Sequence, residues 1–375
     1  MHASRLPALA AQIGMVHGGL AGVKARKTAD RPHVSVKARL RLLANRLLAP
    51  LDLCLVRRAE VMRFLGRDSP RPEEGRSVPA EVRDYLRWDN PRLTGLRERY
   101  RSHPAAAHTK WHPAFVRSAV DLALFRRDNP YVYQTREGIL DQQYLLTAYF
   151  AKGIDRLGLW RILEEDGAFG CYSLDFNGER AISRDLLDCI IEINSLDRAW
   201  NLSGRSDFRL LDIGAGYGRL AHRLARAFPE SIDVVCTDAV AESTFLSEFY
   251  LGWRGASHRA RVVPLDEIEK HLAQSAPEFA TNIHSFSECS SAAIEWWIQL
   301  LAHCRVPRLL IVSNTGRELL STEAPGVQPP RRDFSPVLEK AGYRLVEARP
   351  KYDGAPSLQE HGLYPTYHLF YELQD

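Results

Sequence analysis

The clearest chemical signal in this 375-residue chain is a glycine-rich turn followed by a carboxylate. The stretch LLDIGAGYGRLAHRLARAFPESIDVVCTD, residues 210–238, places Gly214, Gly216 and Gly218 between an apolar run and a helical pattern. A strand, a glycine-rich turn and a helix in this order begin a nucleotide-binding α/β unit. Asp238 ends the next apolar run, where a carboxylate can accept hydrogen bonds from two ribose hydroxyls.

Two departures from the dinucleotide fingerprint bear on which nucleotide is bound. The third glycine of G-x-G-x-x-G would fall at position 219, which is Arg219. Asp212 lies two residues before the first glycine, and a carboxylate there disfavours a pyrophosphate at the helix N-terminus. The same carboxylate suits the ammonium and sulfonium groups of S-adenosylmethionine. We therefore expect S-adenosylmethionine as the cofactor; the alternative is a turn whose glycines serve backbone geometry alone.

Composition indicates an ordinary globular protein. Hydrophobic residues make up 45% and charged residues 26% of the chain. The longest apolar stretches are interrupted by charged residues or proline, so no membrane span and no secretory signal are expected. The six cysteines form no C-x-x-C pair, which is typical of reduced thiols, and we expect a cytoplasmic location.

Positive charge is concentrated at the N-terminus. Residues 1–76 contain fifteen lysines and arginines against six acidic residues, although the whole chain has a net charge of only +4. Val36, Leu40, Leu43 and Leu47 recur at helical spacing in this arm. Such an amphipathic helix could lie on an anionic membrane surface, at the inner face of the membrane, or dock on the protein itself, which is the commoner use.

The remaining chain divides into two regions by its periodicity. Residues 77–200 are predicted to be a mostly helical cap over the acceptor, ending in a helix over 182–196 with Ser183 as its N-cap. Residues 201–375 are predicted to form the cofactor domain, an α/β doubly wound sheet. Its seven predicted strands are 208–213, 232–236, 260–265, 278–284, 308–313, 343–350 and 366–373. Helices are predicted between them, and the last two strands form a hairpin-like pair, which is the Rossmann-like plan of class I methyltransferases.

Four further stretches resemble one family of these enzymes. LLDIGAGYGRLA, TDAVAESTFLSEFYL, NIHSFSE and YPTYHLFYEL are similar to the bacterial sugar O-methyltransferases found beside polysaccharide genes, over roughly residues 125–375. The resemblance implies methylation of a hydroxyl on a glycan, a sugar nucleotide or a glycosylated natural product. One departure is Ala239 and Val240, where that family often carries an aliphatic residue followed by proline.

Candidate catalytic residues follow the fourth predicted strand. His284 is the candidate base, because an unperturbed imidazole titrates near neutral pH. Glu288 could orient His284, bind a sugar hydroxyl or hold a divalent metal. The structural alternative is that His284 caps the strand end and Glu288 begins the next helix.

Candidate binding residues lie in two other segments. Asp266 follows the third predicted strand and could meet the adenine amino group or serve as a helix N-cap. Tyr131, Tyr133, Gln134 and Arg136 combine aromatic and hydrogen-bonding groups suited to a sugar face, although a packed loop would look the same. With Asp212, Gly214, Gly216, Gly218, Asp238 and Ala239, these complete the predicted site.

The sequence indicates other functions less clearly. The basic arm favours a nucleic-acid methyltransferase, but the fourth predicted strand is not followed by the N-P-P-[FYW] box of amino-group methyltransferases, so no nucleic-acid partner is expected. His108 and His112 are spaced i, i+4 but lack a third ligand, which favours a surface pair over a metal site. A scaffold that keeps the fold without turnover is the remaining alternative.

Overall fold

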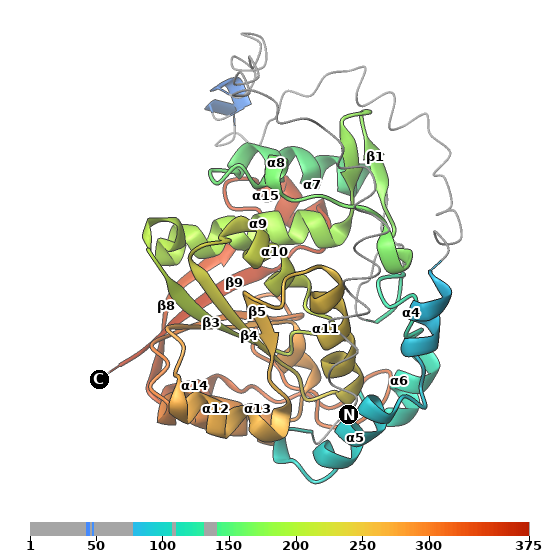
Figure 1. The fold of residues 1–375 in the computed structure, drawn as a ribbon. Coiled ribbons are helices and arrows are strands. Elements are labelled where there is room, and N and C mark those ends of the chain that lie inside the picture. Colours follow the sequence, from blue (N-terminus) through green and yellow to red (C-terminus); the bar gives the residue numbers. More distant parts are fainter. Residues whose placement is uncertain (1–42, 46, 49–77, 107–109, 131–140, 375) are drawn as a thin grey trace.

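A seven-stranded sheet forms the centre of the molecule (Figure 1). The computed structural model describes residues 43–45, 47–48, 78–106, 110–130 and 141–374. Across the sheet the strand order is β5-β4-β3-β6-β7-β9-β8. These strands are β3 (Phe208–Ile213), β4 (Ile232–Thr237), β5 (Ala260–Val262), β6 (Phe279–Ile283), β7 (Arg308–Val312), β8 (Tyr343–Pro350) and β9 (Tyr367–Leu373).

The direction of the strands completes the topology. Strands β3 to β7 pair in parallel, and β9 is antiparallel to both β7 and β8. The chain order reverses between β3 and β6, because β4 and β5 lie on one side of β3 and the later strands on the other. This is the Rossmann-like fold of class I methyltransferases, as predicted, and its ligands bind beyond the carboxyl ends of the strands at the reversal.

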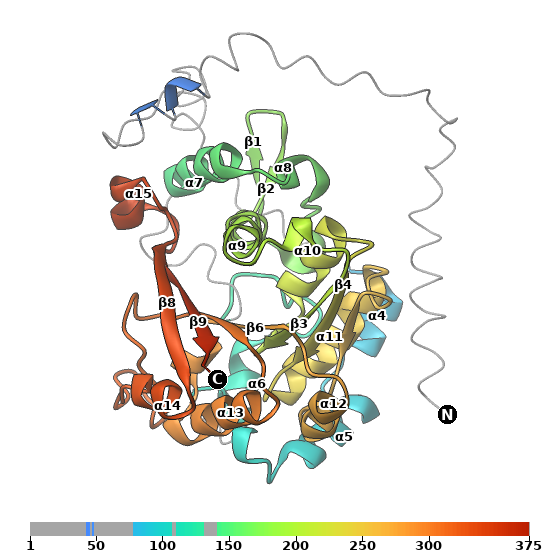
Figure 2. The same ribbon diagram turned by 90° about the vertical axis from the view of Figure 1, so that its left-hand side faces the viewer.

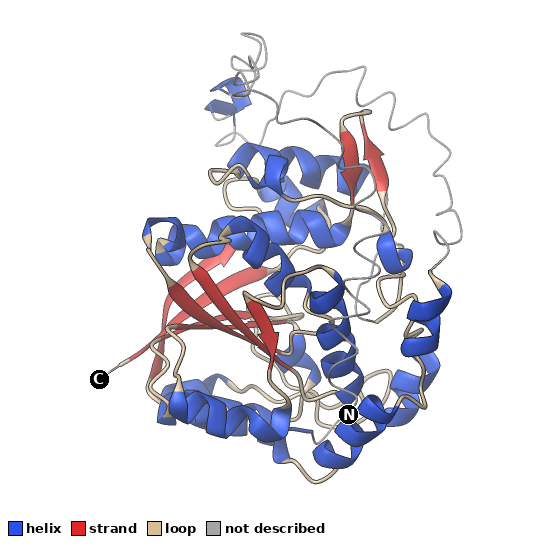
Figure 3. Cartoon of the chain, in the orientation of Figure 1, coloured by secondary structure: helices blue, strands red, loops and turns tan. Residues whose placement is uncertain are grey.

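Helices cover both faces of the sheet, because each central strand is buried on both sides (Figures 2 and 3). Leu210 packs with α9 (Arg184–Trp200) and α10 (Arg219–Ala227), and α7 (Asp141–Ile154) packs on α9. Its neighbour Leu211 points to the opposite face and belongs to a second core. The helices of that core are α11 (Ala241–Trp253), α12 (Ile268–Gln274), α13 (Ser291–His303) and α14 (Ser335–Lys340).

A layer of short helices from the N-terminal side packs against α11 and α13 (Figure 1). It contains α4 (Ala80–Tyr85), α5 (Pro91–Tyr100), the 3₁₀ turn η3 (Pro104–Ala106) and α6 (Pro113–Ala119). Arginines of α5 bind acidic residues of the cofactor domain: Arg97 pairs with Glu242 at 2.7 Å and Arg99 with Asp266 at 2.7 Å. This layer is therefore bound to the cofactor domain by ion pairs as well as apolar packing.

Helix α9 connects the upstream region to the first strand of the sheet. Ser183 is its N-cap, as predicted, because its hydroxyl accepts a hydrogen bond from the backbone N–H of Leu186 at 3.1 Å. The helix continues beyond the predicted residue 196 to Trp200, where Asn201 adopts a left-handed conformation with φ of 53° and ends it.

Several short elements were not predicted. A two-stranded hairpin, β1 (Leu174–Phe176) with β2 (Arg180–Ile182), lies inside the region expected to be mostly helical. The others are the helices α8 (Leu159–Ile162) and α15 (Pro356–His361) and the 3₁₀ turns η4 (Ala168–Gly170), η5 (Leu202–Gly204), η6 (Leu265–Glu267) and η7 (Ser285–Glu288).

The basic arm lies almost entirely outside the described residues. Leu43 and Leu47, two residues of its predicted apolar stripe, are 56% and 71% exposed. Among the helices that the structure describes, none is both long and apolar enough to cross a bilayer.

Candidate functional site

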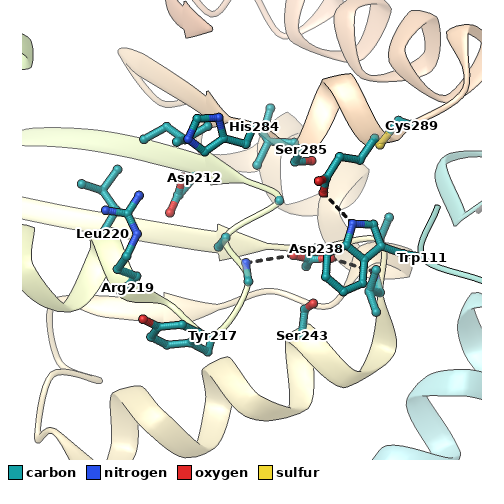
Figure 4. Close-up of a pocket in the computed structure, with 18 of the residues that line it drawn as sticks. Trp111, Asp212, Tyr217, Arg219, Leu220, Asp238, Ser243, His284, Ser285 and Cys289 are labelled. Atoms are coloured by element: carbon teal, nitrogen blue, oxygen red, sulfur yellow. Dashed lines mark hydrogen bonds between the residues drawn. The ribbon is translucent and has the colours of Figure 1, made fainter. Parts of the chain in front are cut away.

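The carboxyl ends of three parallel strands bring the predicted residues into one cavity. Ile213 at the end of β3 pairs with Thr237 of β4 and Asn282 of β6, so the residues that follow these strands meet at one edge. Asp212, Asp238 and His284 all line the cavity at this edge (Figure 4). Gly214, Gly216 and Ala239 line it as well, while Gly218 precedes the first turn of α10.

The glycine turn has a conformation and a packing that require glycine. Gly214 has a φ of 71°, and a side chain there would collide with Ser285. Gly218 has a φ of 86°, and its Cβ would lie 2.9 Å from the hydroxyl of Ser247. The turn therefore runs close to both the β6 loop and α11, with its backbone exposed to the cavity.

Asp238 is tied to the turn by hydrogen bonds from two backbone amides. Its Oδ2 accepts from the N–H of Gly216 at 2.9 Å and its Oδ1 from the N–H of Val240 at 2.8 Å. The residue is only 7% exposed, and burial raises the pKa of its carboxyl to about 7. Each carboxylate oxygen retains acceptor capacity toward the cavity.

Asp212 is a second buried carboxylate in the same cavity. It is 4% exposed, and its Oδ1 accepts a hydrogen bond from the hydroxyl of Thr281 at 2.8 Å. Burial raises the pKa of Asp212 to about 7, although the hydrogen bond from Thr281 opposes that rise. A cationic ligand beside these two carboxylates would favour their ionised forms.

The cavity is charged at one end and apolar at the other, as Figure 4 shows for Arg219 and Trp111 on opposite sides. The charged end contains Arg184, Asp185 and Asp188 of α9, Arg219 of α10 and Asp212 of β3. The other end is lined mostly by apolar side chains, together with the carboxylate of Glu288; the apolar residues are Ala105, Trp111, Val240, Cys289 and Trp297. The arrangement fits an elongated ligand with an aromatic part and an ionised part.

Glu288 is bound by side chains that the sequence did not suggest. Its carboxylate accepts hydrogen bonds from the indole Nε1 of Trp111 at 2.6 Å, from the Nδ2 of Asn314 at 3.3 Å and from the ammonium of Lys110. These donors come from the N-terminal layer and the loop after β7. The ammonium of Lys110 forms an ion pair with this carboxylate, and the described residues contain no group of three histidine, cysteine or acidic side chains arranged for a metal.

His284 lies in the predicted loop, but its pKa is not near neutral as predicted. Its backbone is left-handed, with a φ of 69°, and its N–H donates to the carbonyl of Val312 at 2.7 Å. Burial, reinforced by Arg184, Arg219 and Lys351, lowers the pKa of His284 to about 3. The imidazole is therefore neutral at pH 7, and its buried Nδ1 has no hydrogen-bond partner.

The other predicted binding residues lie elsewhere. Asp266 is in η6 after β5, where its carboxylate binds Arg99 at 2.7 and 2.8 Å, and it is not among the residues that line the cavity. Tyr131, Tyr133, Gln134 and Arg136 lie outside the described residues. Trp111 and Asp185 were not predicted, because neither lies within a recognisable motif.

Solved structures with the same type of fold include methyltransferases of low sequence identity. Magnesium protoporphyrin IX methyltransferase from Synechocystis PCC 6803 is 14% identical, with a TM-score of 0.36, and the match covers 62% of this chain and 99% of that one. An S-adenosylmethionine-dependent methyltransferase from Aquifex aeolicus is 18% identical, with a TM-score of 0.34 and coverage of 48% and 88%. The [4+2]-cyclase SpnF is 16% identical, with a TM-score of 0.35 and coverage of 62% and 95%.

Sequence comparisons add no family. No profile of a known protein family matches the chain, and no curated protein matches it. The assignment of the fold rests on strand order and direction, and the sugar O-methyltransferase family stays a hypothesis.

Proposed function

We propose that this protein is an S-adenosylmethionine-dependent O-methyltransferase that acts on a sugar hydroxyl. The observation that supports the cofactor is that the cavity has a mostly apolar end and a charged end, with the buried carboxylate of Asp238 directly after β4. Adenine, ribose and a zwitterionic amino acid occur in this order in S-adenosylmethionine. The fold alone would not identify the ligand, because one fold serves many functions.

The residues present fit this cofactor. Asp238 can accept hydrogen bonds from the ribose hydroxyls, since both its oxygens are fixed by backbone amides. Ala239, Val240 and Trp111 offer apolar surface to the adenine. Asp212 provides negative charge beside the ammonium and sulfonium groups. When bound, the sulfonium supplies an electrophilic methyl group.

A dinucleotide fits the same cavity poorly. Its pyrophosphate would lie at the glycine turn, beside the buried carboxylates of Asp212 and Asp185. Burial weakens the screening of such like-charge contacts, so they would oppose binding.

The sugar acceptor is supported by the sequence resemblance and by the polar groups around His284. The neutral imidazole can accept a hydrogen bond from an acceptor hydroxyl, and Ser285, Asn314 and Tyr364 lie on the same cavity. Burial and the neighbouring cations lower the pKa of His284 and so make it a weak base. We therefore assign His284 to orienting the hydroxyl, a contribution that comes from positioning rather than from storing the proton.

Two measurements, made one after the other, test the proposal. Calorimetric titration should detect S-adenosylhomocysteine binding and no comparable binding of NAD. Transfer of a radiolabelled methyl group should then be measured with sugar nucleotides and oligosaccharides, and with RNA and DNA as controls. Cofactor binding without transfer to any acceptor would favour the scaffold alternative, and transfer to nucleic acid would replace the sugar.

Peripheral membrane contact through the basic arm is a separate hypothesis. It rests on the charge of residues 1–76 and the exposure of Leu43 and Leu47. Co-sedimentation of the full chain with anionic and with neutral liposomes tests it; failure to sediment with either would dispose of it.

A further inference from the structure

A buried carboxylate oxygen without a partner lies in the cavity at the start of α9. Asp185 is 1% exposed, and its Oδ2 accepts hydrogen bonds from the Nε of Arg126 at 3.3 Å and from the hydroxyl of Tyr217. Its Oδ1 is buried and has no hydrogen-bond partner. Buried carboxylate oxygens are almost always hydrogen-bonded, so an unpaired one that lines a cavity points to a missing donor.

The neighbours of Asp185 hold the carboxylate in place. Arg126 is itself buried between Asp185 and Glu165, and Tyr217 belongs to the glycine turn. Asp185 is also in the first turn of a 17-residue helix, where the helix dipole favours an anion. The side chain is therefore fixed with one oxygen used by the protein and the other left for a ligand.

The charges around Asp185 indicate which part of the ligand it meets. The nearby cations are already paired with acids: Arg184 binds Asp188 at 3.1 Å, and Arg219 binds Glu192 at 2.8 Å. Asp185 and Asp212 both line the cavity, and the described residues show no ion pair between either carboxylate and Arg184 or Arg219, the two arginines of the cavity wall. A ligand cation is the donor that this end of the cavity can accommodate.

We propose that Asp185 binds the ammonium group of the ligand's amino-acid part. This inference rests on the proposed cofactor. It adds to the site a residue outside the glycine turn, which binds the end of the ligand farthest from the adenine. Trp111 and Asp238 then recognise the nucleoside, whereas Asp185 recognises the amino acid. A nucleoside that lacks the amino acid should be bound without help from Asp185.

The test compares the binding of two ligands to the unaltered protein and to the variant Asp185→Asn. Asp185→Asn keeps the shape of the side chain and removes its charge. S-adenosylhomocysteine carries the amino acid, and 5′-methylthioadenosine lacks it. We expect Asp185→Asn to weaken S-adenosylhomocysteine binding by about 10- to 100-fold, the usual range for a hydrogen bond to a charged group, and to change 5′-methylthioadenosine binding less than about twofold.

A matched control changes another acidic residue that lies close to Arg126. Asp166 lies 3.6 Å from Arg126 and pairs with Arg254, but it is not among the residues that line the cavity. Asp166→Asn should leave the affinities for both ligands unchanged. Equal weakening of both ligands by Asp185→Asn would mean that Asp185 acts through Tyr217 on the glycine turn, and would overturn the proposal.

A measurement on the unaltered protein covers the case in which Asp185→Asn does not fold. An analogue of S-adenosylhomocysteine that lacks only the amino group should bind the full chain about 10- to 100-fold more weakly than the parent. Equal binding of the two would overturn the proposal. Failure of the unaltered protein to bind either S-adenosylhomocysteine or 5′-methylthioadenosine would instead overturn the proposed function.

Discussion

The indole Nε1 of Trp111 donates a hydrogen bond to Glu288 at 2.6 Å and so joins the N-terminal layer to the loop after β6. Lys110 binds the same carboxylate, and its ammonium lies 5.7 Å from the centre of the Trp111 ring. Because Trp111 and Glu288 both line the cavity, one wall of the site comes from a segment that precedes the glycine turn by about a hundred residues.

Truncation of Trp111 should weaken binding of the nucleoside part of the ligand. We expect Trp111→Ala to lower the affinities for S-adenosylhomocysteine and 5′-methylthioadenosine equally, by about tenfold, because an aromatic face contributes about 1 kcal/mol beyond its buried area. Trp111→Phe should retain most of the affinity. Calorimetry measures both. Trp160→Ala is the control, since Trp160 packs on Phe176 and is not part of the cavity wall; a similar loss in that variant would speak against a specific role for Trp111.

Ligand affinity should rise with pH between about 6 and 8. Asp212 and Asp238 have pKa values of about 7 in the ligand-free protein, so each is partly protonated there. A bound ammonium or sulfonium favours the ionised carboxylates, and binding should therefore release protons. Calorimetry in buffers of different ionisation enthalpy measures that release. Asp212→Asn should reduce it, and proton uptake on binding would contradict the assignment.

The same two carboxylates should make the ligand-free protein less stable at pH 8 than at pH 6. Burial raises their pKa values from the ordinary value of 3.8 to about 7. The folded protein therefore holds more protons than the unfolded chain between these values, and the stability that they contribute is lost as the pH rises through 7. Melting temperatures across this range provide the measurement. Asp238→Asn should flatten the slope, and an unchanged slope in Asp212→Asn and Asp238→Asn together would exclude these groups as its source.

His284 should affect turnover without setting the pH profile. A group with a pKa of about 3 stays neutral throughout pH 5 to 9. His284→Asn should keep cofactor affinity and reduce turnover by on the order of 10²-fold, the loss that misplacement of a reacting group can cause. The acid limb of the rate profile should persist in this variant. Its disappearance would restore His284 as a base that titrates near neutral pH.

The sequence predicted the parts of the site that are local in the chain. Strand β3, the glycine turn and Asp238 follow from apolar runs and from glycines at alternate positions, because their geometry is set by neighbouring residues. The seven strands were predicted from the alternation of strand-like and helix-like segments, whereas their order in the sheet was established by the structure.

Contacts between distant segments could not be predicted in this way. Trp111 lies between two histidines whose spacing suggested only a surface pair, and nothing near it in the sequence indicates Glu288 as its partner. The pKa of His284 depends on its burial and on Arg184 and Lys351, which belong to α9 and to the segment after β8. Burial and long-range charge decide such properties, and neither has a local pattern.

The buried Arg126 should be essential for stability. Burial alone would raise the pKa of Glu165, but Arg126 and Arg223 hold it well below its usual range. Arg126→Met leaves two buried acids short of a partner, so the free energy of unfolding should fall by about 3–5 kcal/mol at pH 7. Arg101→Met is the control, because Arg101 pairs with Glu98 on the surface and should contribute less than about 1 kcal/mol.

The loss in Arg126→Met should also depend on pH. In the unaltered protein, Glu165 contributes stability above its unfolded pKa of 4.5, and that contribution is lost as the pH falls toward its lower folded value. The variant has less of this contribution to lose, so the difference in unfolding free energy between the two proteins should shrink from pH 7 to pH 4. Denaturant titrations at these two pH values measure it. A difference that stays constant would mean that Arg126 stabilises the fold by packing rather than by its charge.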